Sequence, residues 1–294
     1  MGDPIVVGVD GSRSASRAVR WAAAEAARHR APLRLLHAYL VPQRGYPAAV
    51  LTGREVREAF EEQGRRWLEA AADDVRDLVP DVGTSVVREQ PAAALVAASR
   101  DARLVVVGSQ GLGGLLGLVV GSVAVSVAEH GRCPVVVVRD RQPDAGPPDT
   151  GPVVLGVDGS PAGEAAVGFA FRAASARGAA LVALLAWVPL LADTPYADRV
   201  RVDWDAVEDE QRQALAQRLA GWQEEYPDVV VERRLVRERP AKALVDASGD
   251  AQLLVVGTRG LGGFKGMLLG STSQALIRHA PCPLAVVRPD DASG

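Results

Sequence analysis

The chain contains only two cysteines, Cys133 and Cys282, among its 294 residues. Two cysteines are too few for a disulfide scaffold, and neither lies at metal-ligand spacing from a histidine or from the other cysteine. We therefore expect two reduced, buried thiols. The sequence excludes a small disulfide-stapled fold.

Positive charge is not in excess either, because 33 Lys and Arg residues stand against 36 Asp and Glu residues, for a formal net charge of -3. No basic stripe is present, so the sequence predicts no binding to nucleic acid or to an anionic membrane surface. The N-terminal residues also lack the basic and long apolar regions of a secretory leader. We expect a cytoplasmic protein.

One long run, residues 104–128, has no charged residue and is rich in glycine and valine. A membrane span is one interpretation of it. However, the corresponding stretch of the second half, residues 257–279, carries Arg259, Lys265 and Arg278, which a span would not tolerate easily. With 48% apolar and 23% charged residues, the composition is that of a globular protein, and we expect no membrane partner.

The sequence contains an internal repeat that covers each half of the chain. "VVGVDGS" (6–12) returns as "VLGVDGS" (154–160), "LVVVGSQGLGG" (104–114) as "LLVVGTRGLGG" (253–263), and "HGRCPVVVVR" (130–139) as "HAPCPLAVVR" (279–288). Near-constant spacing over a whole half indicates a duplicated domain. We predict one domain over residues 1–140, a Pro- and Asp-rich linker over 141–150, and a second domain over 151–294.

Within each half, strand-like apolar runs alternate with helical patterns. In the first half the expected strands are 5–9, 32–40, 84–89, 104–108 and 134–139, and the expected helices are 15–29, 55–78, 91–100 and 122–130. This order predicts an α/β fold made of two tandem doubly wound parallel five-stranded sheets with helices on both faces. Ligands of such sheets bind at the carboxyl ends of the strands, where the strand order reverses.

Glycines crowd the exit of the fourth expected strand in both halves. They are Gly108, Gly111, Gly113 and Gly114 before Gly121-Ser122 in the first half, and Gly257, Gly260, Gly262 and Gly263 before Gly270-Ser271-Thr272 in the second. Glycine lets backbone N–H groups converge, and a helix start adds unpaired donors, so the pattern predicts a phosphate cradle. A plain strand-to-helix turn, which needs only one or two glycines, remains the alternative.

Two common phosphate motifs do not fit these loops. A P-loop needs a Lys followed by Ser or Thr after its final glycine, and neither Gly121-Ser122 nor Gly270-Ser271 is followed in that way. A dinucleotide fingerprint follows the first strand, whereas these loops follow the fourth. The loops therefore match neither of these two phosphate-binding motifs.

The spacing Gly-x-x-Gly, nine residues and Gly-Ser in both halves resembles the ATP-binding signature of the universal stress protein family. The opening "VGVDGS" and the closing "CPVVVVR" resemble that family too, so the resemblance covers nearly the whole chain. It implies a tandem-domain member with the fold of adenine nucleotide alpha hydrolases and one ATP site in each half.

The resemblance also implies which residues contact ATP. Asp10 and Asp158 end the first strand of each half beside the nucleotide, Gly8 and Gly156 allow close approach, and Ala38 and Ala186 face the adenine. The remaining contacts implied are Gly108, Ser109, Gln110, Gly111, Leu112, Gly113, Gly114, Gly121, Ser122 and Val123, and Gly257, Thr258, Arg259, Gly260, Leu261, Gly262, Gly263, Gly270, Ser271 and Thr272.

Some of these roles stay open at the level of sequence. Asp10 and Asp158 can hold Mg²⁺ against the phosphates, or they can form an Asx turn or a helix N-cap in Asp-Gly-Ser. Arg259 can pair with phosphate or point to solvent. His130 and His279, near the ends of helices, are better explained by helix C-terminal capping than by catalysis.

The resemblance implies an ATP-binding, nucleotide-dependent stress-response regulator that is not an enzyme. Its expected partners are ATP with Mg²⁺, a second copy of the chain in a homodimer, and unknown regulatory proteins. One alternative is a slow ATPase or nucleotidyl transferase using the same pocket, although neither half offers a convergent Lys, His and carboxylate set near the glycine loop. A nucleotide-free interaction module is the other alternative.

Overall fold

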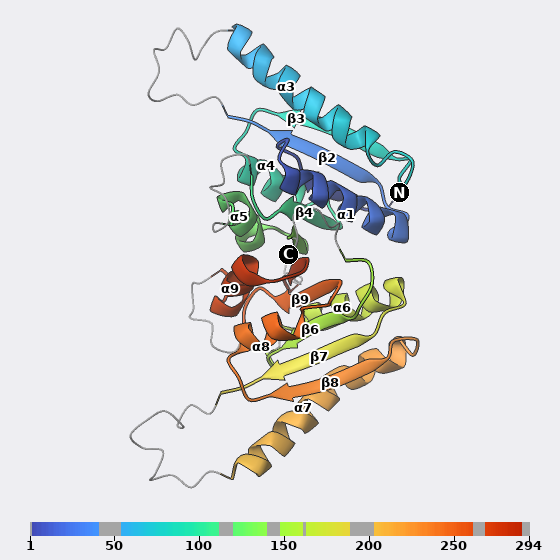
Figure 1. Ribbon diagram of the computed structural model, residues 1–294, viewed down its shortest axis with the longest axis vertical. Coiled ribbons are helices and arrows are strands. Elements are labelled where there is room, and N and C mark those ends of the chain that lie inside the picture. Colours follow the sequence, from blue (N-terminus) through green and yellow to red (C-terminus); the bar gives the residue numbers. More distant parts are fainter. Residues whose placement is uncertain are drawn as a thin grey trace, which may run out of the picture. The chain divides into compact units, whose positions relative to one another are not determined.

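The computed structural model describes residues 2–40, 54–111, 120–139, 148–160, 163–188, 203–260 and 268–289. The chain divides into two units, residues 1–147 and 148–294, and Figure 1 shows their elements coloured along the sequence. Residues 141–147 of the expected linker lie outside the described residues. Each unit is described below by itself.

The strands of unit 1 form a parallel sheet in the order β3-β2-β1-β4-β5. They are β1 (Ile5–Gly8), β2 (Leu33–Ala38), β3 (Val82–Val87), β4 (Leu104–Gly108) and β5 (Val135–Val138). The chain moves outward from β1 to β3 and then returns to the other side of β1 with β4. The strand order therefore reverses between β1 and β4.

Unit 2 repeats this topology in the order β10-β9-β6-β7-β8, again with parallel pairs. Its strands are β6 (Val153–Val157), β7 (Leu181–Ala186), β8 (Val231–Val236), β9 (Leu253–Gly257) and β10 (Leu284–Val287). The predicted fold class, two tandem doubly wound parallel five-stranded sheets, is confirmed.

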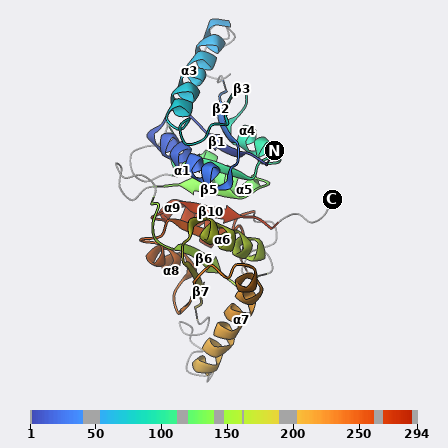
Figure 2. The same cartoon turned by 90° about the vertical axis from the view of Figure 1, so that its right-hand side faces the viewer.

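Helices cover both faces of each sheet (Figure 2). In unit 1, α1 (Arg13–His29) and α3 (Arg54–Asp73) pack on one face, and α4 (Pro91–Ala98) and α5 (Ser122–His130) on the other. In unit 2 the matching pairs are α6 (Glu164–Arg177) with α7 (Trp204–Glu225), and α8 (Pro240–Ala247) with α9 (Ser271–His279). Central strands are consequently covered on both sides, which explains their unbroken Val and Leu runs.

Helix α3 is shorter than the sequence predicted, because it ends at Asp73 and not at residue 78. Beyond it the chain tightens, and the backbone N–H groups of Val75 and Leu78 each donate to the carbonyl three residues earlier, at 3.2 and 3.0 Å. These turns bury Val75 and Val79. Burial of the two valines outweighs continuation of the helical pattern. Among the described segments, no helix has both the length and the apolarity needed to cross a membrane.

Neither cysteine forms a disulfide; Cys282 is buried as predicted, whereas the prediction of a buried thiol is wrong for Cys133, which is half-buried. The Cys133 thiol donates to the Pro134 carbonyl at 3.4 Å. Burial raises the pKa of Cys133 to about 12. Because the thiolate is the reactive form, Cys133 is protonated and inert near neutral pH.

Alkylation of the native protein with iodoacetamide at about pH 8 is therefore expected to be at least about tenfold slower than that of an unperturbed thiol. Mass spectrometry of the modified protein checks this. The urea-unfolded chain is the control, in which both cysteines react at the ordinary rate. Fast modification of Cys133 in the folded protein contradicts the burial that raises its pKa.

Candidate functional site

A cavity of about 670 Å³ lies at the reversal of strand order in unit 1. It opens at the carboxyl ends of β1, β2 and β4 and is closed by the beginnings of α4 and α5. The described residues that line it are Gly8, Val9, Asp10, Ala15, Leu36, Ala38, Pro91, Leu95, Val107, Gly108, Gln110, Gly111, Val120, Gly121, Ser122, Val123 and Ala124. This is the position that doubly wound sheets use for ligands.

The lining of the cavity combines aliphatic and polar groups. Leu36, Pro91 and Leu95 bring aliphatic groups from β2 and α4. Gln110 and Ser122 add polar groups next to the start of α5. The cavity is therefore suited to a ligand with a flat apolar part and a polar or anionic part.

The Asp10-Gly11-Ser12 turn joins the cavity to α1. Asp10 Oδ1 accepts from the backbone N–H of Ser12 at 2.9 Å, and Ser12 Oγ accepts from the backbone N–H of Ala15 at 3.1 Å as the N-cap of α1. Asp10 Oδ2 lies against Gly111, because a Cβ on that glycine would be 2.8 Å away. The Asp10 carboxylate thus forms the Asx turn and also lines the cavity.

The corresponding turn of unit 2 has the same form. Asp158 Oδ1 accepts from the backbone N–H and from the hydroxyl of Ser160, at 2.9 and 2.8 Å. A Cβ on Gly260 would lie 2.5 Å from Asp158 Oδ2. In both units the second glycine of the signature is therefore required for close approach to the aspartate.

Each glycine loop is hydrogen-bonded to the helix that follows it. The Gly121 N–H donates to the Ser109 carbonyl at 2.9 Å, and the Gly270 N–H donates to the Thr258 carbonyl at 2.8 Å. Gly121 and Gly270 are the N-caps of α5 and α9, and in the described part of the chain neither helix start has a side-chain cap. Donors of the first turn are therefore left for a ligand.

Gly108 serves a packing role that the sequence did not indicate. A Cβ there would lie 2.5 Å from Ser14 Oγ and 2.7 Å from the Ser14 backbone carbon. Ser14 Oγ in turn accepts from the Gln110 N–H at 3.3 Å, and Ser12 Oγ donates to the Gln110 carbonyl at 3.4 Å. The glycine lets α1 lie close enough to anchor the loop.

Other residues named from the sequence lie as follows. Ala38 and Ala186 end β2 and β7 and are half-buried, Gly156 lies under the side chain of Leu244 as Gly8 lies under Leu95, and Val123 is half-buried on the cavity wall. Gly257 ends β9, Thr258 is buried, Arg259 and Ser271 are exposed, and Thr272 is half-buried. Leu112, Gly113, Gly114, Leu261, Gly262 and Gly263 lie outside the described residues.

Sequence reasoning missed the α4 side of the cavity. Pro91 and Leu95 are four residues apart and therefore share one face of the helix, and both line the cavity. The signal was present, because "PAAALVAAS" in the first half is matched by "PAKALVDAS" in the second. What the sequence did not show is that α4 packs against β1 and β2, which places this face over the switch point.

An aromatic cluster stands behind the Asp10 turn, on the α3 face of the sheet. The Trp67 ring covers Gly11, whose φ of 81° suits glycine, and meets the His37 ring edge-on at 5.2 Å between centroids. His37 is buried, and its Nδ1 lies 2.7 Å from the Val9 carbonyl. The cluster supports the turn from outside the cavity.

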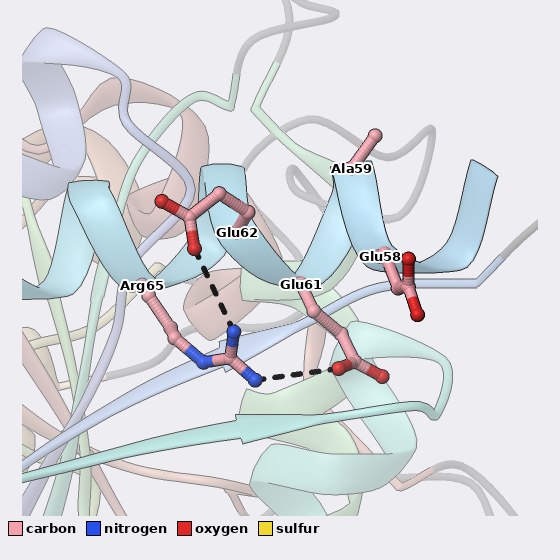
Figure 3. A pocket seen from close by; sticks show the side chains of 5 residues that line it. All are labelled: Glu58, Ala59, Glu61, Glu62 and Arg65. Atoms are coloured by element: carbon pink, nitrogen blue, oxygen red, sulfur yellow. Dashed lines mark hydrogen bonds and ion pairs between the residues drawn. The ribbon is translucent and has the colours of Figure 1, made fainter. Parts of the chain in front are cut away.

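A second hollow lies on the outer surface of α3 (Figure 3) and is lined by Glu58, Ala59, Glu61, Glu62 and Arg65. Its carboxylates are already paired, since Arg65 reaches Glu61 at 3.4 Å and Glu62 at 3.6 Å, and Arg54 reaches Glu58 at 2.6 Å. Pairs three or four residues apart stabilise a solvated helix. We therefore interpret this hollow as part of the solvated surface of α3 and not as a ligand site.

The two histidines near the Cys-Pro pairs occupy helix ends. His130 is exposed in the last turn of α5, with Nδ1 at 3.0 Å from the Ser126 carbonyl, and His279 ends α9. These positions fit interaction with the C-terminal end of the helix dipole.

Comparison with known proteins identifies relatives of this chain. The model of the universal stress protein family matches residues 1–139 and 150–288. A universal stress protein from Mycolicibacterium smegmatis is 43% identical over 290 residues, covering 97% of each chain. A crystal structure of a universal stress protein from Archaeoglobus fulgidus has a TM-score of 0.67 at 16% identity, covering 98% of this chain and 99% of that one. A universal stress protein solved in complex with cAMP is 32% identical, covers 47% of this chain and 97% of that one, and has a TM-score of 0.37.

Proposed function

This chain belongs to the universal stress protein family, and from that premise we propose that each of its two units binds one ATP and that the chain acts as a nucleotide-dependent regulator. The observation that carries the proposal is the cavity at the switch point of unit 1, whose lining combines aliphatic side chains with the uncapped start of α5. An adenine nucleotide likewise combines an apolar base with charged phosphates.

The aliphatic lining residues suit adenine. Leu36 and Leu95 offer aliphatic surface to the faces of a flat ring, and Ala38 keeps its small side chain at the end of β2. A small residue there leaves the neighbouring backbone accessible to a base edge. Pro91, at the first position of α4, has no backbone N–H, so a base that covers this position buries no unpaired donor there.

The uncapped start of α5 suits phosphate. The backbone N–H groups in the first turn of α5 point away from the helix body at its N-terminus, and the positive end of the helix dipole there favours an anion. Asp10 alone is too few protein ligands for a closed metal site, and the described residues contain no group of three or more His, Cys, Asp or Glu placed to hold a metal. Mg²⁺ is commonly held by one or two carboxylates together with phosphates and water, so Asp10 and Asp158 fit Mg²⁺ only when ATP brings its phosphates.

We favour binding over turnover. Asp10 is the only ionisable side chain among the described residues that line the cavity. Phosphoryl transfer depends on positioned cations and on a group that orients the nucleophile. The proposed consequence of binding is an ordered glycine loop and a changed surface, offered to a second copy of the chain in a homodimer or to a regulatory partner protein.

Freshly purified protein is expected to carry about two adenine nucleotides per chain when both cradles are filled. Denaturation, ion-exchange chromatography of the supernatant and mass detection give the identity and the count. Protein stripped by unfolding and refolding, then given ATP with Mg²⁺, is the matched control for loss during purification. A chain that carries no nucleotide and takes up none on this addition would show the proposal to be wrong.

A further inference from the structure

The two units present different side chains at the same positions of the proposed site. Position by position, Gln110, Val123 and Ala124 of unit 1 become Arg259, Thr272 and Ser273 of unit 2. The backbone around them is alike, which allows a direct comparison. This comparison rests on the proposed function, since it concerns what the two sites select.

Arg259 of unit 2 occupies the position equivalent to Gln110 of unit 1. A Cβ on Gly121 would lie 3.8 Å from the Cα of Gln110, and a Cβ on Gly270 would lie 3.6 Å from the Cα of Arg259. Gln110 lines the cavity of unit 1. Arg259 is exposed and precedes Gly260, which touches the Asp158 carboxylate. The backbone of Arg259 therefore lies between the start of α9 and the aspartate turn, at the position where unit 1 has the neutral Gln110.

The helix starts differ in the same direction. Val123 and Ala124 give α5 an apolar first turn on the cavity wall. At the start of α9, Thr272 is half-buried and carries a hydroxyl, and Ser273 is buried with its hydroxyl donating to the Gly257 carbonyl at 2.8 Å. That bond ties the first turn of α9 to the end of β9. Ala124 has no hydroxyl with which to form it.

The supports behind the aspartate turns differ in charge. Trp67 covers Gly11 in unit 1. In unit 2 the half-buried Arg218 of α7 donates to the carbonyls of Gly159 and Ser160. Unit 1 has its own cation nearby in Arg13, the first residue of α1, but Arg13 is exposed and is not among the described residues that line the cavity.

We infer that the two sites select different parts of the nucleotide: unit 2 selects for the polyphosphate through Arg259 and the start of α9, and unit 1 selects mainly for the nucleoside. An Arg–phosphate contact is charge-assisted and adds with each phosphate in reach. ATP and AMP share the nucleoside and differ in phosphates. The ratio of ATP affinity to AMP affinity is consequently larger at unit 2.

The test uses full-length chains in which one site is closed by an aspartate at the helix N-cap. The chain with Gly121→Asp reports on unit 2, and the chain with Gly270→Asp reports on unit 1. Isothermal titration with ATP and with AMP, in the presence of Mg²⁺, gives the two affinities for each. The ratio of ATP to AMP affinity is expected to be about tenfold higher at unit 2.

Arg259→Gln in the unit 2 reporter is expected to weaken ATP about tenfold and AMP less than about threefold, and Gln110→Arg in the unit 1 reporter to shift the ratio the opposite way. Arg259→Lys keeps the charge and retains part of the selectivity. The same substitutions in the otherwise unchanged chain, fitted with two sites, repeat the measurement if a reporter folds poorly.

Equal ratios in the two reporters, or a change at Arg259 that weakens ATP and AMP by the same factor, overturns the inference and leaves ATP binding in place. Absence of binding in the unchanged chain gives a different result, a stoichiometry of zero before any substitution. That result overturns the proposed function and with it the inference.

Discussion

Replacing Gly121 with aspartate is expected to abolish nucleotide binding at unit 1 while leaving the unit at least as stable as before. Gly121 is the N-cap of α5, and a Cβ added there meets its nearest atom at 3.7 Å, which is ordinary contact. Aspartate is among the best N-cap residues and complements the helix dipole, so we expect a gain of about 0.5 kcal/mol in the free energy of unfolding. The same carboxylate takes the N–H donors proposed for phosphate and repels it.

Titration and denaturant unfolding measure the two effects separately. The count is expected to fall from about two nucleotides per chain to about one, a loss that the substitution confines to unit 1 because Gly270 is untouched. Gly121→Asn is the matched control, since it caps the helix in the same way without the charge and weakens binding less. A Gly121→Asp chain that still binds two nucleotides with unchanged affinity would exclude the start of α5 from the site.

Replacing Gly11 with alanine is expected to cost unit 1 about 2–4 kcal/mol in the free energy of unfolding. Two separate causes contribute. The φ of 81° is a conformation that L-residues adopt at a cost, and a Cβ would overlap the indole ring of Trp67. The turn that positions Asp10 is held from behind by that ring, so nucleotide binding at unit 1 is expected to weaken as well.

A double-mutant cycle separates the two causes. Trp67→Leu removes the ring, and in that background Gly11→Ala is expected to cost only the backbone strain, about 1–2 kcal/mol. Urea unfolding of the four chains gives the coupling energy. Gly221→Ala in α7, where an added Cβ meets nothing within 4 Å, is the control glycine, and it is expected to stabilise the protein by about 0.5–1 kcal/mol. Equal costs of Gly11→Ala with and without Trp67 would contradict the steric part of the argument.

Much of the fold follows from the sequence because local and long-range preferences agree. Leu104–Gly108 and the helix at Ser122–His130 appear with the predicted bounds, since a buried Val run and a glycine N-cap leave little choice. The end of α3 was predicted too late because the helical pattern continues past Asp73. Only the tertiary burial of Val75 and Val79 shows that the chain must tighten there.

Some residues of the candidate site could likewise be named from the sequence, and others could not. Residues next to the glycines, such as Gln110 and Ser122, could be named from the sequence and line the cavity. Leu36 and Leu95 were missed because an apolar residue on a strand or helix looks the same whether it faces a core or a ligand. The close packing of Gly108 against Ser14 could not be predicted either, because the two residues are distant in the sequence and meet only in the fold.

The covers of the two aspartate turns show how a duplicated chain diverges. Gly11 and Gly159 both have φ near 80°, so the turn itself tolerates little change after duplication. The long helix behind it is under no such restriction, and the two copies now place Trp67 and Arg218 over equivalent turns. Backbone geometry held one position constant, while side-chain chemistry at its neighbour was left open to selection. Under the proposed function, two nucleotide sites that began as copies now differ in the side chains that support their aspartate turns.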